Sequence, residues 1–160
     1  MSGFLRRMVI FFSTGAYSGF APIAPGTAGS IVAIPLYLAL SGLPAFLFVI
    51  TVVAFLFMAT WFCGVAQVIF QKKDSRQIVI DEIGGFLVTM SFLPRTPLYV
   101  VSGFILFRIL DVAKPFPANR LEAMEGGYGV VADDVIAGMT ACLLFLALAW
   151  IAGKTGCPVF

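Results

Sequence analysis

The stretch that decides the fold, residues 31–70, reads IVAIPLYLALSGLPAFLFVITVVAFLFMATWFCGVAQVIF. Its clearest break is SGLP at 41–44, where Pro44 can open a new helix. The break predicts a short helix near 30–41 and a longer one near 44–70. Because about 20 apolar residues are needed to cross ~30 Å of hydrocarbon, residues 30–43 are short for a full membrane span.

The composition of the whole chain also indicates a membrane protein. Of the 160 residues, 61% are hydrophobic and 11% are charged, against roughly half and a quarter in soluble domains. This balance predicts a membrane protein with a single domain over residues 1–160. The net charge is only +2, and no basic run is interleaved with aromatic residues, so a nucleic-acid partner is excluded. The chain has no histidine and no CxxC pair, which excludes the usual zinc sites and catalysis by histidine.

Three more helices follow from the apolar pattern, at 77–93, 98–113 and about 133–152. Residues 1–29 are interpreted as an N-terminal interfacial segment followed by a Gly/Pro loop, and 114–132 as a long polar cytoplasmic loop. The expected fold is an all-α, polytopic membrane bundle of about four to five transmembrane or re-entrant helices, with a polar site at its cytoplasmic face.

The basic residues orient this bundle. If every apolar segment crosses or dips through the membrane, the N-terminus and the loops at 71–76 and 114–132 share one side. Eight of the ten basic residues then lie on that side, and only Arg95 and Lys154 lie opposite. The positive-inside rule makes the basic side cytoplasmic. On this interpretation, anionic headgroups attract Arg6, Arg7, Lys72, Lys73 and Arg76.

The acidic residues point to chemistry. All eight lie between positions 74 and 134, and five form three sets, Asp81 with Glu82, Asp111, and Asp133 with Asp134. In the expected topology all three sets lie at helix ends at one membrane depth. A charged side chain at the bilayer centre costs roughly 2.5–3.5 kcal/mol, so clustered carboxylates indicate a bound cation or a function. Ligands that are all oxygen favour Mg²⁺ over zinc or copper.

Positive charge is available next to these acids. Arg108, Asp111 and Lys114 are three residues apart, which places them on roughly one helix face. The planar fork of arginine and the point charge of lysine both suit a phosphate dianion. The alternative is that Arg108, Lys114 and Arg120 only form buried salt bridges with the acids.

Two glycine-rich stretches stand next to predicted helices, GFAPIAPGTAGS at 19–30 and EGGYGVVADD at 125–134. Such loops let backbone N–H groups approach an anion closely, and Thr27 or Ser30 could also cap the helix that follows. Neither stretch is a Walker P-loop, because no GK[ST] follows. An ordinary turn is the simpler alternative for each stretch.

Four motifs in this order, APGTAGS (24–30), IVIDEIGG (78–85), LFRILDVAKPFP (106–117) and GGYGVVADDVIAG (126–138), resemble the phosphatidylglycerophosphatase A family over nearly the whole chain. The resemblance implies hydrolysis of the phosphate monoester of phosphatidylglycerophosphate to phosphatidylglycerol, with Mg²⁺ required. It also implies an all-helical protein of the bacterial inner membrane, whose acidic motifs converge on one site at the cytoplasmic face.

The physical pattern and the resemblance lead to one hypothesis for the site. Asp81, Glu82, Asp111 and Asp134 provide the Mg²⁺ ligands and their supporting carboxylates. One of these four, or Asp133, is the general base toward the attacking water; the sequence does not separate ligand from base. The residues expected to bind the substrate are Arg108, Lys114, Thr27, Ser30 and Gly127.

Two other classes of protein remain as alternatives. A small ion- or proton-coupled transporter also keeps carboxylates among its helices, although it would place them near the bilayer midplane. A CDP-alcohol phosphotransferase uses Mg²⁺ and aspartates at a membrane face, but its DGxxAR…GxxxDxxxD pattern is absent. The sequence leaves the oligomeric state open.

Overall fold

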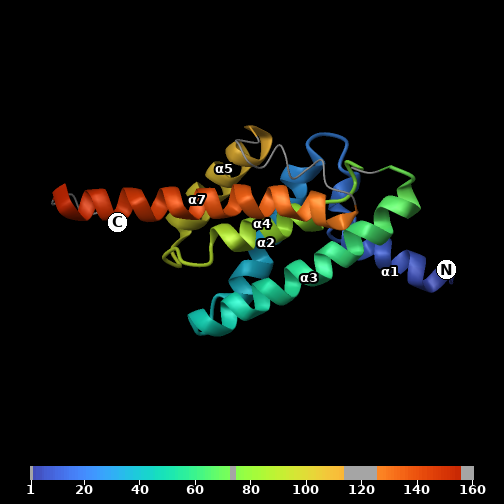
Figure 1. Ribbon diagram of the computed structural model, residues 1–160, viewed down its shortest axis with the longest axis horizontal. Coiled ribbons are helices and arrows are strands. Elements are labelled where there is room, and N and C mark those ends of the chain that lie inside the picture. Colours follow the sequence, from blue (N-terminus) through green and yellow to red (C-terminus); the bar gives the residue numbers. More distant parts are fainter. Residues whose placement is uncertain (1, 73–74, 114–125, 156–160) are drawn as a thin grey trace.

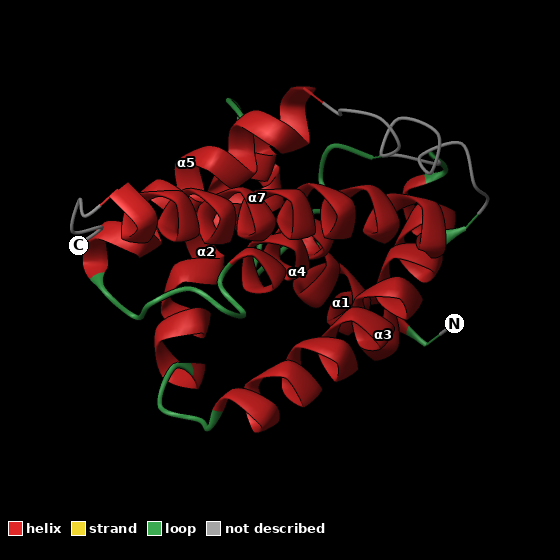
Figure 2. Cartoon of the chain, turned by 60° about the vertical axis from the view of Figure 1, so that its left-hand side comes forward, coloured by secondary structure: helices red, strands yellow, loops and turns green. Residues whose placement is uncertain are grey.

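The computed structural model describes residues 2–72, 75–113 and 126–155. These residues form six α-helices and one 3₁₀ helix, joined by turns and loops without any strand (Figure 2). The helices are α1 (Gly3–Ser13), η1 (Ser18–Phe20), α2 (Pro25–Leu40), α3 (Ala45–Phe70), α4 (Ile80–Thr89), α5 (Pro97–Ala113) and α7 (Gly127–Thr155). For the described part of the chain, the expected all-α fold is confirmed.

Two helices have the length and apolar composition to cross a membrane, namely α3 over 26 residues and α7 over the 25 residues Gly127–Ile151. Both expose large apolar side chains, such as Phe57 at 72% and Trp150 at 63%, which suits contact with lipid. The helices α2, α4 and α5 have 16, 10 and 17 residues. The structure therefore supports two spans, and a total of four to five stays a prediction.

The short helix α4 lies at the centre of the bundle, between α3 and α7 (Figure 1), and it also packs against α2 and α5. Eight of its ten residues are buried. Below its first turn, Phe86 and Leu87 are fully buried in one apolar cluster with Phe107 of α5 and Tyr37 of α2. Burial on all sides fixes the orientation of α4, and with it the two acidic residues of its first turn.

A pair of glycines lets α4 and α7 approach closely. A Cβ atom on Gly138 of α7 would overlap the carbonyl oxygen of Gly85 of α4. A Cβ atom on Gly85 would lie 2.8 Å from the carbonyl oxygen of Asp134 and 2.6 Å from a ring carbon of Phe107. An aspartate precedes each glycine by four residues, Asp81 on α4 and Asp134 on α7. Because residues four apart share a helix face, this crossing brings the two aspartates together.

Several helix bounds differ from the expected ones. The last helix begins at Gly127 rather than about 133, so the expected loop 114–132 is wrong in its final residues. The glycines there were interpreted as a loop, but a Cβ on Gly127 would lie 2.7 Å from the amide nitrogen of Gly64 on α3, and Val130 and Val131 are buried against α3. Close packing explains these small residues better than a turn.

The start of α2 and the ends of α4 also differ. The helix α2 begins at Pro25, five residues before the expected start, because proline is favourable in the first helical turn. A Cβ on Gly29, one turn further on, would lie 2.5 Å from Cβ of Val79, so the small residues of this stretch are packed in a helix. The helix expected at 77–93 is confined to Ile80–Thr89.

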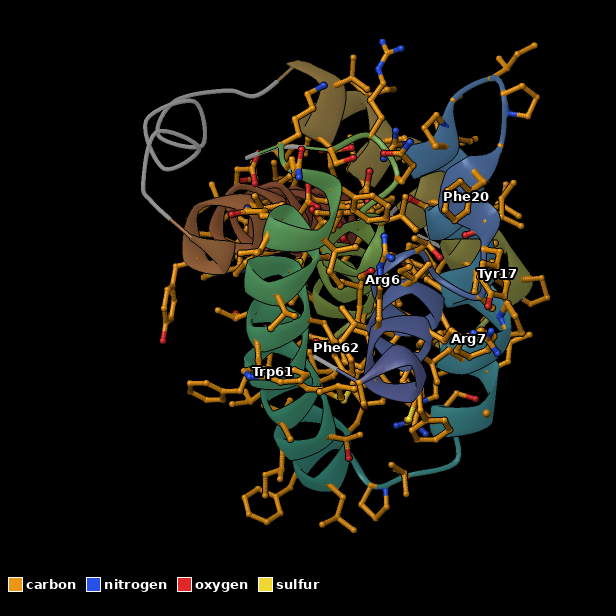
Figure 3. All side chains as sticks on the ribbon, turned by 90° about the vertical axis from the view of Figure 1, so that its right-hand side faces the viewer. Arg6, Arg7, Tyr17, Phe20, Trp61 and Phe62 are labelled. Carbon is orange, nitrogen blue, oxygen red and sulfur yellow. The ribbon has the colours of Figure 1, made fainter. Side chains whose placement is uncertain are left out.

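The first helix, α1, lies beside α3, and Phe62 of α3 faces α1 (Figure 3). The ring centroids of Phe12 and Phe62 are 5.3 Å apart, a usual distance for packed aromatic rings. Phe4 is 75% exposed on the same helix as Arg6 and Arg7. This mixture of exposed apolar and basic residues suits a membrane surface, and the interfacial role of this segment stays a prediction.

At the end of the bundle away from the first turn of α4, Arg95 joins two turns. Its guanidinium donates hydrogen bonds to the backbone carbonyls of Ser41 and Leu43. Ser41 and Leu43 belong to the turn between α2 and α3, whereas Arg95 lies between α4 and α5. Arg95, one of the two basic residues expected opposite the others, thus has a structural partner.

The glycine crossing generates the first prediction. Gly138→Ala should destabilise the protein by about 1–3 kcal/mol, because the added methyl group meets a backbone oxygen that cannot move without shifting α4. The measurement is the thermal unfolding midpoint of the purified protein in detergent.

Gly64→Ala is the matched control, since the nearest atom to its Cβ would be 3.7 Å away. This variant should be neutral or slightly more stable, because alanine is the better helix former. Equal midpoints for the two variants would contradict the tight crossing.

Candidate active site

A cavity of about 400 Å³ opens at the end of the bundle where α4 begins. Its wall is formed by the first residues of α2, the loop before α4, the first turn of α4, the last two turns of α5 and the first two turns of α7. Its lining residues are Ala24, Pro25, Gly26, Arg76, Ile78, Asp81, Glu82, Arg108, Asp111, Val112, Val130, Asp133 and Asp134. Segments far apart in the sequence thus meet at one polar site.

Three carboxylates of this cavity form a cluster. Asp81, Glu82 and Asp134 each offer one oxygen atom, and these oxygens all lie within 4.8 Å of one another. Asp81 and Asp134 are 6% and 4% exposed. Among the described residues, Asp81 Oδ1 and Glu82 Oε2 are buried without a hydrogen-bond partner. Buried oxygens of this kind are costly unless something binds them, and an all-oxygen set fits a hard cation such as Mg²⁺.

Arg108 of α5 contacts two carboxylates of the cavity. Its Nη1 is 2.5 Å from Oδ2 of Asp111, one turn along the same helix, and 4.0 Å from Oε1 of Glu82. A Cβ on Gly26 of α2 would overlap Glu82 Oε1 and lie 3.1 Å from both terminal nitrogens of Arg108. The start of α2 therefore covers this ion pair closely, and only glycine fits at position 26.

Burial changes the proton affinity of the acids in α4. Burial raises the pKa of Glu82 to about 7; the negative charge of Asp111 adds to this effect and the positive charge of Arg108 opposes it. Burial also raises the pKa of Asp81 well above its ordinary value, with a further contribution from the charge of Glu82. Without a bound cation, the acids of α4 are therefore shifted toward their protonated forms, as expected for carboxylates gathered in a desolvated site.

The structure brings most of the predicted site residues together. Six of them line the cavity, namely Asp81, Glu82, Asp111, Asp133, Asp134 and Arg108. Their individual roles stay predictions. Lys114, expected to bind the phosphate, lies outside the described residues.

Three predicted substrate-binding residues do not line the cavity. The hydroxyl of Ser30 is buried and donates to the carbonyl oxygen of Gly26 within α2, at 3.0 Å. Thr27 is a half-buried residue inside α2, because that helix starts before it. Gly127 packs against α3. For all three, the expected glycine loops are parts of helices, which explains the difference.

Two lining residues were not predicted as part of the site. Gly26 leaves room for the Glu82–Arg108 pair, and its signal in the sequence was the Pro-Gly step that starts α2. Arg76 was attributed to lipid headgroups, yet it lines the cavity. Its place five residues before Asp81, in the loop that leads into the acidic helix, was the available signal.

Clustered carboxylates beside guanidinium groups, at one end of an apolar helical bundle, define a class of site suited to phosphate chemistry with a divalent cation. The chain belongs to the phosphatidylglycerophosphatase A family, because the family profile of that description matches residues 11–149. Accordingly, the resemblance seen in the four motifs is confirmed.

Curated relatives agree with this assignment. A phosphatidylglycerophosphatase A of Escherichia coli is 34% identical over 145 residues, which cover 88% of this chain and 84% of the relative. The phosphatidylglycerophosphatase A of Haemophilus influenzae is 32% identical over 149 residues, 90% of each chain. A Bacteroides thetaiotaomicron protein, provisionally named a phosphatidylinositol-3-phosphatase, is 35% identical over 152 residues, 90% of this chain and 95% of the relative. No solved structure matches the chain. The protein is therefore an enzyme of the phosphatase class.

The raised pKa of Glu82 generates a prediction on stability. Between the ordinary value of 4.5 and about 7, the folded protein holds a proton that the unfolded chain releases, so the free energy of unfolding falls as pH rises through this window. In EDTA, the thermal midpoint should fall by several degrees from about pH 5 to about pH 8.

A cation that binds only the folded state should offset this loss, and more strongly at the higher pH, where the ligands are deprotonated. Excess Mg²⁺ should therefore flatten the dependence. In Glu82→Gln, which lacks the titrating carboxyl group, the slope in EDTA should be smaller. A wild-type midpoint that rises with pH in EDTA would contradict the assignment of raised pKa values to this cluster.

Proposed function

We propose that the protein hydrolyses the phosphate monoester of phosphatidylglycerophosphate, giving phosphatidylglycerol and inorganic phosphate, with Mg²⁺ as cofactor. The family and the two relatives named phosphatidylglycerophosphatase A support this substrate. The third relative's name refers to another phosphorylated lipid. That substrate has a different headgroup, but its dephosphorylation belongs to the same reaction class. The observation that carries the proposal is the cluster of Asp81, Glu82 and Asp134, which lines one cavity with Arg108. One buried oxygen of Asp81 and one of Glu82 have no hydrogen-bond partner among the described residues.

Mg²⁺ fits the donor set of this cluster, and Asp81, Glu82 and Asp134 would hold it. When bound, the ion supplies positive charge that stabilises the charge developing on the phosphoryl oxygens. Asp111 is the supporting carboxylate, because its contact at 2.5 Å fixes the guanidinium of Arg108 at the cavity wall. Uncatalysed hydrolysis of phosphate monoesters is very slow, so the site must combine charge, positioning and an activated water.

The remaining steps fall to the chain's own side chains. Asp133 lines the cavity outside the three-residue cluster and is 6% exposed; we assign it to accept the proton of the attacking water. The water oxygen bonds to phosphorus, the ester P–O bond breaks, and the proton ends on the glycerol hydroxyl that leaves. Arg108 holds the phosphoryl oxygens through whichever N–H groups its carboxylate partners leave available.

The membrane setting is part of the proposal. The cavity lies where α3 ends and α7 begins, so the site would stand at one end of both candidate spans. In the expected topology eight of the ten basic residues lie on that side of the membrane, which favours the cytoplasmic face of a bacterial inner membrane. Four to five helices would cross or enter the bilayer, with α2, α4 and α5 as the shorter ones. The acyl chains of the substrate would then lie against the exposed apolar helix faces.

The test is phosphate release from phosphatidylglycerophosphate by the purified protein in neutral detergent, with Mg²⁺ and with EDTA. Asp134→Asn should lower kcat/KM by at least about a hundredfold, because it removes a carboxylate from the cation cluster. Arg7→Gln is the control, since it changes the net charge by one unit at an exposed position of α1, away from the cavity.

The outcomes separate the parts of the proposal. Release that requires Mg²⁺ and collapses only in Asp134→Asn is the expected result. A folded, monodisperse protein without release under either condition would rule out this substrate, and phosphatidylinositol 3-phosphate in a parallel assay would test the other headgroup. Release that EDTA does not affect would keep the phosphatase and remove Mg²⁺ from the mechanism.

A further inference from the structure

Arg76 is the charged residue that the proposed mechanism does not use among the described residues that line the cavity. The described lining residues include five carboxylates but only two cations, Arg76 and Arg108. Arg108 is 17% exposed and already engaged with Asp111 and Glu82. Arg76 is exposed, and among the described residues it makes no ion pair. No described residue therefore competes with a ligand for its guanidinium at the cavity.

The position of Arg76 suggests which part of a ligand it meets. Arg76 belongs to the loop between α3 and α4, whereas Asp81 and Asp134 at the cation cluster are nearly fully buried. A cavity with an exposed cation at its rim and buried acids further in fits an extended ligand with two separate anionic groups. The inner group would reach the acids and the outer one would stay at the rim.

The proposed substrate has this chemistry. Phosphatidylglycerophosphate carries a terminal phosphomonoester and, on the other side of a glycerol unit, the phosphodiester that leads to the acyl chains. When the monoester lies at the buried acids, the phosphodiester must lie toward the mouth, because the diacylglycerol stays with the lipid. Phosphatidylinositol 3-phosphate has the same two groups, which is consistent with the name of the third relative.

We infer that Arg76 binds the phosphodiester of the lipid substrate at the cavity rim and so selects lipids that carry a second phosphate. This inference rests on the proposed function. The planar fork of arginine matches two phosphate oxygens at once. Lys72, in the same loop, does not line the cavity, so a general attraction of basic residues to headgroups does not explain the position of Arg76.

The two reaction products allow the two phosphate positions to be tested separately. Phosphatidylglycerol keeps only the phosphodiester, and inorganic phosphate occupies only the monoester position. Steady-state kinetics on phosphatidylglycerophosphate, in neutral detergent without anionic lipid, give KM and kcat for the wild type, Arg76→Gln, Arg76→Lys and Lys72→Gln. Inhibition constants for short-chain phosphatidylglycerol and for inorganic phosphate are measured with the same variants.

Arg76→Gln should raise KM about tenfold and leave kcat within about twofold, because the lost contact involves a part of the substrate that does not react. The inhibition constant of phosphatidylglycerol should rise by a similar factor, and that of inorganic phosphate should not change. For Arg76→Lys, both KM and the inhibition constant of phosphatidylglycerol should lie between those of the wild type and Arg76→Gln, since lysine keeps the charge and loses the planar fork. Lys72→Gln should behave as the wild type.

A rise in the inhibition constant of inorganic phosphate would overturn the inference and place Arg76 at the monoester. Unchanged constants in Arg76→Gln would also overturn the inference, because they would show that Arg76 does not bind the substrate. Equal effects in Lys72→Gln would overturn it as well, because they would indicate a general attraction between basic residues and the lipid.

Binding of short-chain phosphatidylglycerol in EDTA, measured by the shift in thermal midpoint, requires no turnover. If the wild type does not hydrolyse phosphatidylglycerophosphate, the proposed function fails. This binding shift still reports on Arg76, and a shift that is equal in wild type and Arg76→Gln would overturn the inference independently.

Discussion

The close approach of α4 and α7 at Gly85 and Gly138 is the constraint on which the site depends. Neither glycine can carry a side chain without meeting the backbone of the other helix. One turn away on each helix stands an aspartate, so the distance between the two backbones sets the distance between Asp81 and Asp134. A packing contact that involves no polar side chain thus determines how close two negative charges are held.

Holding these negative charges close together costs free energy, and neighbouring residues offset only part of that cost. Burial opposes ionisation of the acids in α4, and Arg108 neutralises only part of the charge because Asp111 shares it. The carboxylate oxygens left without hydrogen-bond partners therefore favour the binding of protons or of a hard cation. Buried charged groups that are only partly paired are a usual sign of a functional site.

The sequence was sufficient to predict an all-helical protein and to select the acidic residues that line the cavity. The apolar runs of α3 and α5 predicted their bounds within a residue or so, and the expected topology grouped Asp81, Asp111 and Asp134 at one membrane depth. Prediction failed where glycine was interpreted as a loop former. Gly26 and Gly127 lie in helices, and each is a glycine because a neighbouring helix or side chain comes too close for a Cβ atom. Such a contact between distant segments leaves no local pattern in the sequence. Arg76 was missed for the same reason, since only the fold places its loop at the cavity.

The recurrence of Asp-x-x-x-Gly, at 81–85 and again at 134–138, has a consequence for how this enzyme changes in evolution. Each aspartate is tied by helix geometry to a glycine that never touches the substrate, and the two glycines restrict each other across the crossing. The four positions should therefore be inherited as one unit, together with Glu82 of the acidic cluster. A search for distant homologues that uses both spaced pairs together should recognise members that have lost the surrounding sequence, and should reject helical proteins that have clustered acids by chance.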